Sequence, residues 1–244
     1  SGTADIVKYD FGYEIDPVWE AGNKNIPGIY IEFKEPWLNP KGFEQIVYDV
    51  LANTQDMNII EKPEPEDTPF YINNGTINVG NTNGKVILQT FSLESLVRVA
   101  EVFQGKVPMC FLLWKGTGAT DLTYDDPLGY ASFINLGVKY KAHFIGPCIA
   151  GAPNDYPELD QPWQDYLIHR AKMKNHPYTF DTYDQMAKYF GQYNFGVADG
   201  MFNPPYLDAL FTNHSDMSIN YMITHGWRKS PASQTLVDAR EVLR

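Results

Sequence analysis

Glu32 and Lys34 are the two residues whose types and spacing best suit chemistry in this chain of 244 residues. They lie two positions apart in the apolar and aromatic stretch GIYIEFKEPW, residues 28–37. Residues i and i+2 of a β-strand share a face, so both charges point the same way. A carboxylate oxygen binds a hard divalent cation, and a neighbouring ammonium binds an anionic oxygen such as that of a phosphate. The spacing leaves open the alternative of an exposed edge strand with a weak ion pair.

The histidines and cysteines do not have the spacing of a metal site. None of the five histidines forms a metal-ligand pair with another by spacing. We expect His176 to be structural because it opens a strand-like run, whereas His214 follows the last such run and could approach the rim of a pocket. Cys110 and Cys148 both lie in apolar runs. Two buried free thiols and a disulfide between neighbouring strands are both compatible with that placement.

The elements that must position these residues alternate along the chain. Apolar runs of strand length occur at residues 29–34, 86–91, 107–114, 143–150, 176–180 and 207–213. Segments with the period of an amphipathic helix lie at residues 42–54, 92–105, 126–141, 160–175, 181–193 and 215–226. Asp or Ser opens every helical segment after the first, which predicts N-caps at these residues.

Strands separated by helices indicate parallel βαβ units, in either a doubly wound sheet or most of an eight-stranded β/α barrel. We expect a lead-in at residues 1–27 and a core at 28–226, followed by a tail at 227–244. Residues 54–85, rich in Asn, Gly, Pro and Glu, are predicted to be an insertion within that core. The reactive side chains of a barrel stand at the carboxyl ends of its strands, and Glu32 and Lys34 occupy such an end.

The overall charge argues against one class of partner. The formal charge is −11 and the isoelectric point is about 4.8, so phosphate backbones would repel the chain and nucleic-acid binding is not expected. The sequence also lacks a run of 18 or more apolar residues, so no transmembrane segment is expected.

Four stretches, taken in order, resemble the glycerophosphodiester phosphodiesterases. GIYIEFKEPW (28–37) is similar to that family's third-strand motif, Ile-Glu-x-Lys, which is often followed by Pro. VILQTFSLESLVRV (86–99) resembles its fourth strand and helix, and HPYTFDTYDQM (176–186) its seventh-strand motif. ALFTNHSDMSINYM (209–222) resembles its eighth-strand motif. The HPYT and LFTN versions are similar to those of the periplasmic or secreted branch, so a secreted or periplasmic location is expected.

The resemblance implies a (β/α)8 TIM barrel of the phosphodiesterase type, to which this chain supplies about strands 3 to 8. It implies hydrolysis of glycerophosphodiesters to an alcohol and glycerol 3-phosphate, assisted by a divalent cation, Ca²⁺ or Mg²⁺. Glu32 matches the family's metal ligand on the third strand, and Lys34 matches its phosphate-facing lysine. Phe91 and Tyr178 match the aromatic residues that wall the substrate pocket. Asn213 stands where the family often has Asp.

The chain departs from the family in its first two strands. It has no His-Arg-Gly, and its one early Glu-x-Asp, Glu14-Ile15-Asp16, is not followed by the second catalytic histidine. Those motifs supply the general acid and base and two further metal ligands in the family. We therefore expect a separate N-terminal fragment or chain to complete the barrel.

Two alternatives to the phosphodiesterase stay open at this stage. One is a catalytically inactive barrel that acts as a binding or structural protein. The other is a glycosidase, which would need a second carboxylate at a set distance from Glu32. Asp181 is the only other acid that the sequence places at the end of a strand.

Overall fold

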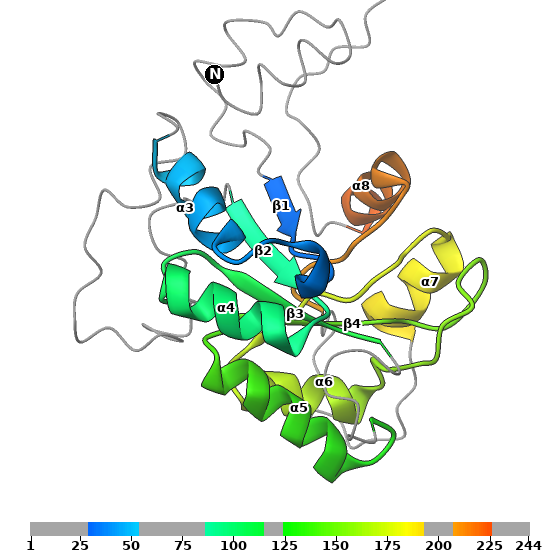
Figure 1. Ribbon diagram of the computed structural model, residues 1–244. Coiled ribbons are helices and arrows are strands. Elements are labelled where there is room, and N and C mark those ends of the chain that lie inside the picture. The colour runs from blue at the N-terminus through cyan, green and yellow to red at the C-terminus, as the bar shows by residue number, and fades with distance from the viewer. Residues whose placement is uncertain (1–28, 54–85, 115–123, 193–206, 226–244) are drawn as a thin grey trace, which may run out of the picture.

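The computed structural model describes residues 29–53, 86–114, 124–192 and 207–225 of the chain (Figure 1). The predicted lead-in (1–27), the insertion (54–85) and the tail (227–244) lie outside the described residues. Within the described residues, no helix has the length and apolar character that crossing a membrane requires.

Five parallel strands form one sheet in the order β1-β2-β3-β4-β5. Their bounds are Ile29–Glu32 (β1), Val86–Thr90 (β2), Met109–Leu113 (β3), Phe144–Pro147 (β4) and Lys174–Asn175 (β5). Sequence order and spatial order coincide, and each strand is followed by helical structure, as the alternating pattern predicted. The registry pairs Glu32 with Gln89, Gln89 with Cys110 and Cys110 with Phe144.

Helices follow each strand (Figure 1). Their bounds are Phe43–Asn53 (α3), Leu93–Phe103 (α4), Pro127–Lys139 (α5), Pro162–Arg170 (α6), Tyr183–Ala187 (α7) and Ser215–Thr224 (α8). A 3-10 turn, Pro36–Leu38 (η1), precedes α3, and a π-helical turn, Lys188–Gln192 (η3), continues α7. All six predicted helical segments therefore contain a helix.

The side chains of the sheet's outer face and of α3 to α6 form the main core. Buried members come from strands, such as Leu88, Phe111 and Ile145, and from helices, such as Leu96 and Phe133. Phe111 and Phe133 stack with ring centroids 4.3 Å apart. Helices α3 to α6 thus share one face of the sheet, as in a barrel, whereas a doubly wound sheet carries helices on both faces.

The other face of the sheet is concave, because Tyr30 of the first strand meets residues that follow the last strand, His176 and Phe211. Tyr30 of β1 contacts Phe211 with ring centroids 4.8 Å apart, and its hydroxyl lies 3.1 Å from His176 Nδ1. His176 in turn stacks on Phe144 of β4 at 4.0 Å. The chain therefore has an α/β fold with a curved parallel sheet, an arrangement compatible with part of a β/α barrel.

The segment 207–211 runs beside β5 without forming a regular strand. The amides of Asp208 and Ala209 donate to the Asn175 carbonyl, and the Phe211 amide donates to the Pro177 carbonyl at 2.9 Å. The predicted sixth run (207–213) therefore extends the sheet through individual hydrogen bonds. Its side chains also anchor it, as Asp208 shows.

Asp208 joins this segment to β5 and α6. Its carboxylate accepts hydrogen bonds from Lys174 Nζ at 2.8 Å, the Asn175 amide at 2.8 Å and His169 Nε2 at 2.7 Å. The other ring nitrogen of His169 lies 3.2 Å from Asp165 Oδ2. Burial lowers the pKa of His169, but Asp165 and Asp208 outweigh it and bring the pKa to about 10, so the ring is an imidazolium held between two carboxylates.

The helix starts are only partly as predicted. Ser92 caps α4 by accepting from the Ser95 amide, and Asp126 caps α5. The cap of α6 is Gln161 rather than Asp160, because the Asp160 side chain is buried and accepts from Asn175 Nδ2 at 2.8 Å.

Helix α7 also starts differently, since its cap is Thr182 rather than Asp181. The Asp181 carboxylate is engaged by Asn213, whose backbone amide and side-chain amide both donate to it at 2.9 Å. Helix α8 has His214 at its N-cap, with no side-chain cap hydrogen bond, so Ser215 is not the cap either. Asp160 and Asp181, which the local pattern favoured as N-caps, thus accept hydrogen bonds from residues of other elements instead.

The predicted helix at 160–175 was too long, and the strand predicted at 176–180 started too late. The helix ends at Arg170, Lys172 adopts a left-handed conformation with a φ of 64°, and β5 begins at Lys174. Beyond Asn175, one bridge between Cys148 and Tyr178 continues the pairing.

Candidate functional site

The candidate site is built at the carboxyl end of β1. Phe33, directly after the strand, donates its amide to the Gln89 carbonyl at 2.8 Å, and its own carbonyl accepts from Thr90 Oγ1 at 2.7 Å. Phe33 is also buried in the outer core. These contacts fix the backbone of Phe33. Glu32 and Lys34, on either side of Phe33, therefore emerge from a constrained strand end.

Glu32 and Lys34 contact each other, which fits both the shared face that their spacing predicted and the alternative of an exposed edge strand with a weak ion pair. Lys34 Nζ lies 3.3 Å from Glu32 Oε1, with 74% of the lysine side chain and 21% of the glutamate side chain exposed. An ion pair this accessible contributes about 1 kcal/mol or less to stability. Stability alone therefore gives little reason for the pair, whereas its charges are accessible to a ligand.

Glu32 belongs to the concave face of the sheet. Tyr30, two residues before Glu32, packs on that face against Phe211, and alternation along the strand places Glu32 on the same side. Ile87 of β2 and Phe91, directly after that strand, pack against the cluster of Cys110, Leu112 and Phe144, which places Gln89 between them on this face. Glu32 thus stands where the reactive groups of a β/α barrel stand.

Phe91 and Tyr178, the two predicted pocket residues, lie in contact. Their rings meet edge to face, with centroids 5.7 Å apart and planes at 88°. The Tyr178 hydroxyl donates to the Leu113 carbonyl at 3.0 Å, which fixes the ring at the carboxyl end of β3. The sequence analysis missed Tyr156, whose ring meets Tyr178 at 5.9 Å. These three rings form an aromatic wall on the same end of the sheet as Glu32.

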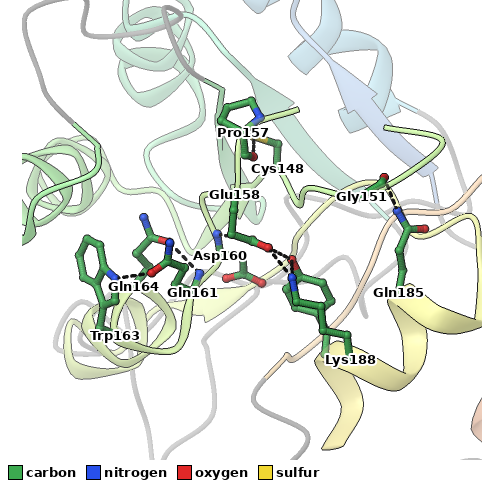
Figure 2. Close-up of polar contacts among 11 residues, drawn as sticks. Cys148, Gly151, Pro157, Glu158, Asp160, Gln161, Trp163, Gln164, Gln185 and Lys188 are labelled. Carbon is green, nitrogen blue, oxygen red and sulfur yellow. Dashed lines mark hydrogen bonds and ion pairs between the residues drawn. The ribbon is translucent and has the colours of Figure 1, made fainter. Parts of the chain in front are cut away.

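Glu158 anchors the loop that carries Tyr156. Figure 2 shows its carboxylate directed at Lys188, whose Nζ lies 2.9 Å from Oε2, and Tyr189 donates to the same oxygen. The other oxygen accepts the Asp160 amide at 3.1 Å. The loop between β4 and α6 is therefore attached to η3, which restrains one side of the aromatic wall.

The two cysteines are free and buried, which confirms the first of the two expectations. Burial raises the pKa of each thiol to about 12, so both are neutral at physiological pH. Cys148 donates to the Pro157 carbonyl at 3.2 Å. Neither thiol is therefore suited to act as a nucleophile or a metal ligand.

His176 is buried on the concave face and serves the structure, as expected. Burial lowers its pKa to about 4, so the ring is neutral, and it is occupied by Tyr30 and Phe144. His214 is exposed at the start of α8. In the part of the chain that the structure describes, no histidine contacts Glu32 or Lys34.

The described residues offer two oxygen-bearing side chains that suit a metal ion at this strand end, Glu32 and Gln89. Among the described residues, no three His, Cys, Asp or Glu side chains come together in a way that could hold an ion. The donors present are nevertheless of the right kind, because Glu32 offers a carboxylate and Gln89, its partner in register, has a buried side-chain oxygen that lacks a hydrogen bond. Hard oxygen donors suit Ca²⁺ and Mg²⁺.

Comparison with models of known protein families gave no match, and comparison with curated proteins gave none either.

Proposed function

We propose that this protein is the larger part of a glycerophosphodiester phosphodiesterase. The observation that carries the proposal is the Glu32–Lys34 pair, a carboxylate and an ammonium 3.3 Å apart at the carboxyl end of a parallel strand. The aromatic contact between Phe91 and Tyr178 at the same end supports it, as does the order of the four motifs. The reaction is hydrolysis of a glycerophosphodiester to an alcohol and glycerol 3-phosphate.

Each side chain has a role in this reaction. Glu32 would hold a divalent cation, which would supply charge neutralisation at the phosphate oxygens and activation of the attacking oxygen. Lys34, mostly exposed beside it, binds the phosphate and stabilises the charge that grows on it during the displacement. Phe91 and Tyr178 exclude water from one side of the substrate.

A separate N-terminal fragment or chain completes the site in this proposal. Within the described residues, β1 has a strand neighbour on one side only, and an unpaired strand edge is a template for a further strand. That fragment brings the first two strands, the catalytic histidines and further carboxylates. A secreted or periplasmic location follows from the branch of the family that the motifs resemble.

Release of glycerol 3-phosphate from glycerophosphocholine tests the proposal. The protein, purified under native conditions with whatever copurifies, is assayed with millimolar Ca²⁺ or Mg²⁺ and again with a chelator. Lys34→Gln is expected to lower the rate roughly 10²-fold or more. Lys41→Gln, an exposed lysine after η1, is the matched control and should keep the wild-type rate. Equal rates for the two variants would refute the role of Lys34.

The second candidate is a non-catalytic protein that binds phosphodiesters on the same site. It is favoured by the lack of any contact between Glu32 or Lys34 and a histidine in the described part of the chain. Such a protein would bind glycerophosphocholine in a Lys34-dependent manner and release no glycerol 3-phosphate. Calorimetric titration of the ligand, run beside the product assay, separates the two functions.

A further inference from the structure

Gln89 has a buried oxygen that its surroundings do not satisfy. Its Oε1 is shielded from solvent and has no hydrogen-bond partner. A buried polar atom left without a partner costs roughly 1–3 kcal/mol, and a bound ion or water is one established way in which proteins satisfy such an atom. Since this oxygen can only accept, its partner must be a donor or a cation.

The position of Gln89 beside Glu32 favours a cation over a hydrogen-bond donor as the partner of the Gln89 oxygen. The two residues are partners in register on the adjacent strands β1 and β2, so their side chains leave the same face of the sheet. Neighbouring strands lie about 4.8 Å apart. Oxygen ligands of Ca²⁺ lie about 2.3–2.6 Å from the ion, so one ion between the two side chains can reach both oxygens.

Cys110 and Lys34 do not supply a further ligand for such an ion. Cys110 follows Gln89 in register on β3, but its thiol is neutral, with a pKa raised by burial to about 12. Lys34 Nζ is paired with Glu32 Oε1. Among the described residues, Glu32 and Gln89 are thus two acceptor side chains on one face of the sheet, and the Lys34 ammonium is paired with Glu32.

We propose that the side-chain oxygen of Gln89 is a ligand of the divalent cation that Glu32 binds. The inference rests on the proposed function, which it deepens by adding a neutral ligand from the second described strand. A cation between the two oxygens displaces Lys34 from Glu32 and leaves its ammonium to the phosphate. The described part of the chain then supplies one charged ligand, Glu32, and one neutral ligand, Gln89.

Calcium titration of the full chain by calorimetry tests this ligand directly. Gln89→Met keeps the length of the side chain but removes the oxygen, and it should weaken Ca²⁺ binding roughly tenfold or more. Gln89→Glu adds a carboxylate and should strengthen it. Gln45→Met, an exposed glutamine on α3, is the control and should bind as the wild type does. Thermal unfolding without calcium checks that the variants fold.

Each pattern of results has a distinct meaning. Weaker binding by Gln89→Met and tighter binding by Gln89→Glu supports the inference. Wild-type affinity in Gln89→Met, together with lost binding in Glu32→Gln, would overturn the role of Gln89 while the cation site of the proposed function stands. Absence of calcium and magnesium binding by the wild type would overturn both. A change in activity without a change in binding would assign Gln89 to the substrate or to Lys34 and overturn the inference.

Discussion

Removal of the His169 charge should make the protein less stable in a way that depends on pH. The imidazolium bridges Asp165 at 3.2 Å and Asp208 at 2.7 Å, and so links α6 to the segment beside β5. Burial lowers its pKa, but the two carboxylates raise it more, from 6.5 to about 10. Because the pKa is raised in the folded state, the stabilisation is complete below about pH 6.5 and is lost as the pH rises through about 10.

The size of the effect follows from the same contacts. A shift from 6.5 to about 10 corresponds to about 5 kcal/mol at 1.36 kcal/mol per pH unit, before solvent screening. Since 36% of the His169 side chain is exposed, screening reduces this value strongly. Two partly exposed ion pairs together support about 1–2 kcal/mol. His169→Gln should therefore lower the free energy of unfolding by about 1–2 kcal/mol near pH 6 and by almost nothing above about pH 10.

Urea unfolding of wild type and His169→Gln, followed by tryptophan fluorescence at both pH values, measures this difference. Asp208→Asn and the double variant complete a cycle that isolates the coupling between the two side chains. The coupling should be present near pH 6 and absent above about pH 10. If the difference in free energy of unfolding between wild type and His169→Gln stays constant with pH, the His169 charge is not the source of the stabilisation.

Three further predictions concern the core and the helices. Gly146→Ala should lower the free energy of unfolding by about 1–3 kcal/mol, measured in urea, because a Cβ there would lie 2.7 Å from the Leu112 side chain and 3.0 Å from the His176 carbonyl oxygen. Unchanged stability would contradict this packing. Ser92→Ala should cost about 1 kcal/mol, since α4 loses its N-cap; a gain would contradict it. A thiol reagent should label Cys110 and Cys148 only after unfolding, and rapid labelling of the native protein would show that they are accessible.

The alternation of strands and helices was predictable because burial imposes a local period on the sequence. The boundaries around β5 were not predictable, because the helical pattern of the sequence continues past Arg170, whereas the helix ends there. The helix ends because Lys172 turns left-handed and Asn175 donates its amide to Asp160 and Asp165. Those partners come from other parts of the fold, and no local pattern contains them.

The candidate site was predictable where one strand holds its residues. Glu32 and Lys34 are two positions apart on one chain segment, so their contact followed from strand geometry. Gln89 required the registry of β1 against β2, which the sequence does not state. Tyr156 lies in a loop whose path is set by the anchoring of Glu158 to η3. Motif resemblance alone singled out Phe91 and Tyr178, and their contact with each other was seen only in the structure.

Under the proposed function, Glu32 binds the cation on which hydrolysis depends. The most direct measurement is the rate of glycerol 3-phosphate release from glycerophosphocholine as Ca²⁺ or Mg²⁺ is titrated into chelator-treated protein. Wild type and Glu35→Gln, an exposed glutamate three residues further along, should show the same cation-dependent rate, whereas Glu32→Gln should show none. A Glu32→Gln variant with the same rate and the same cation dependence as the wild type would contradict the account.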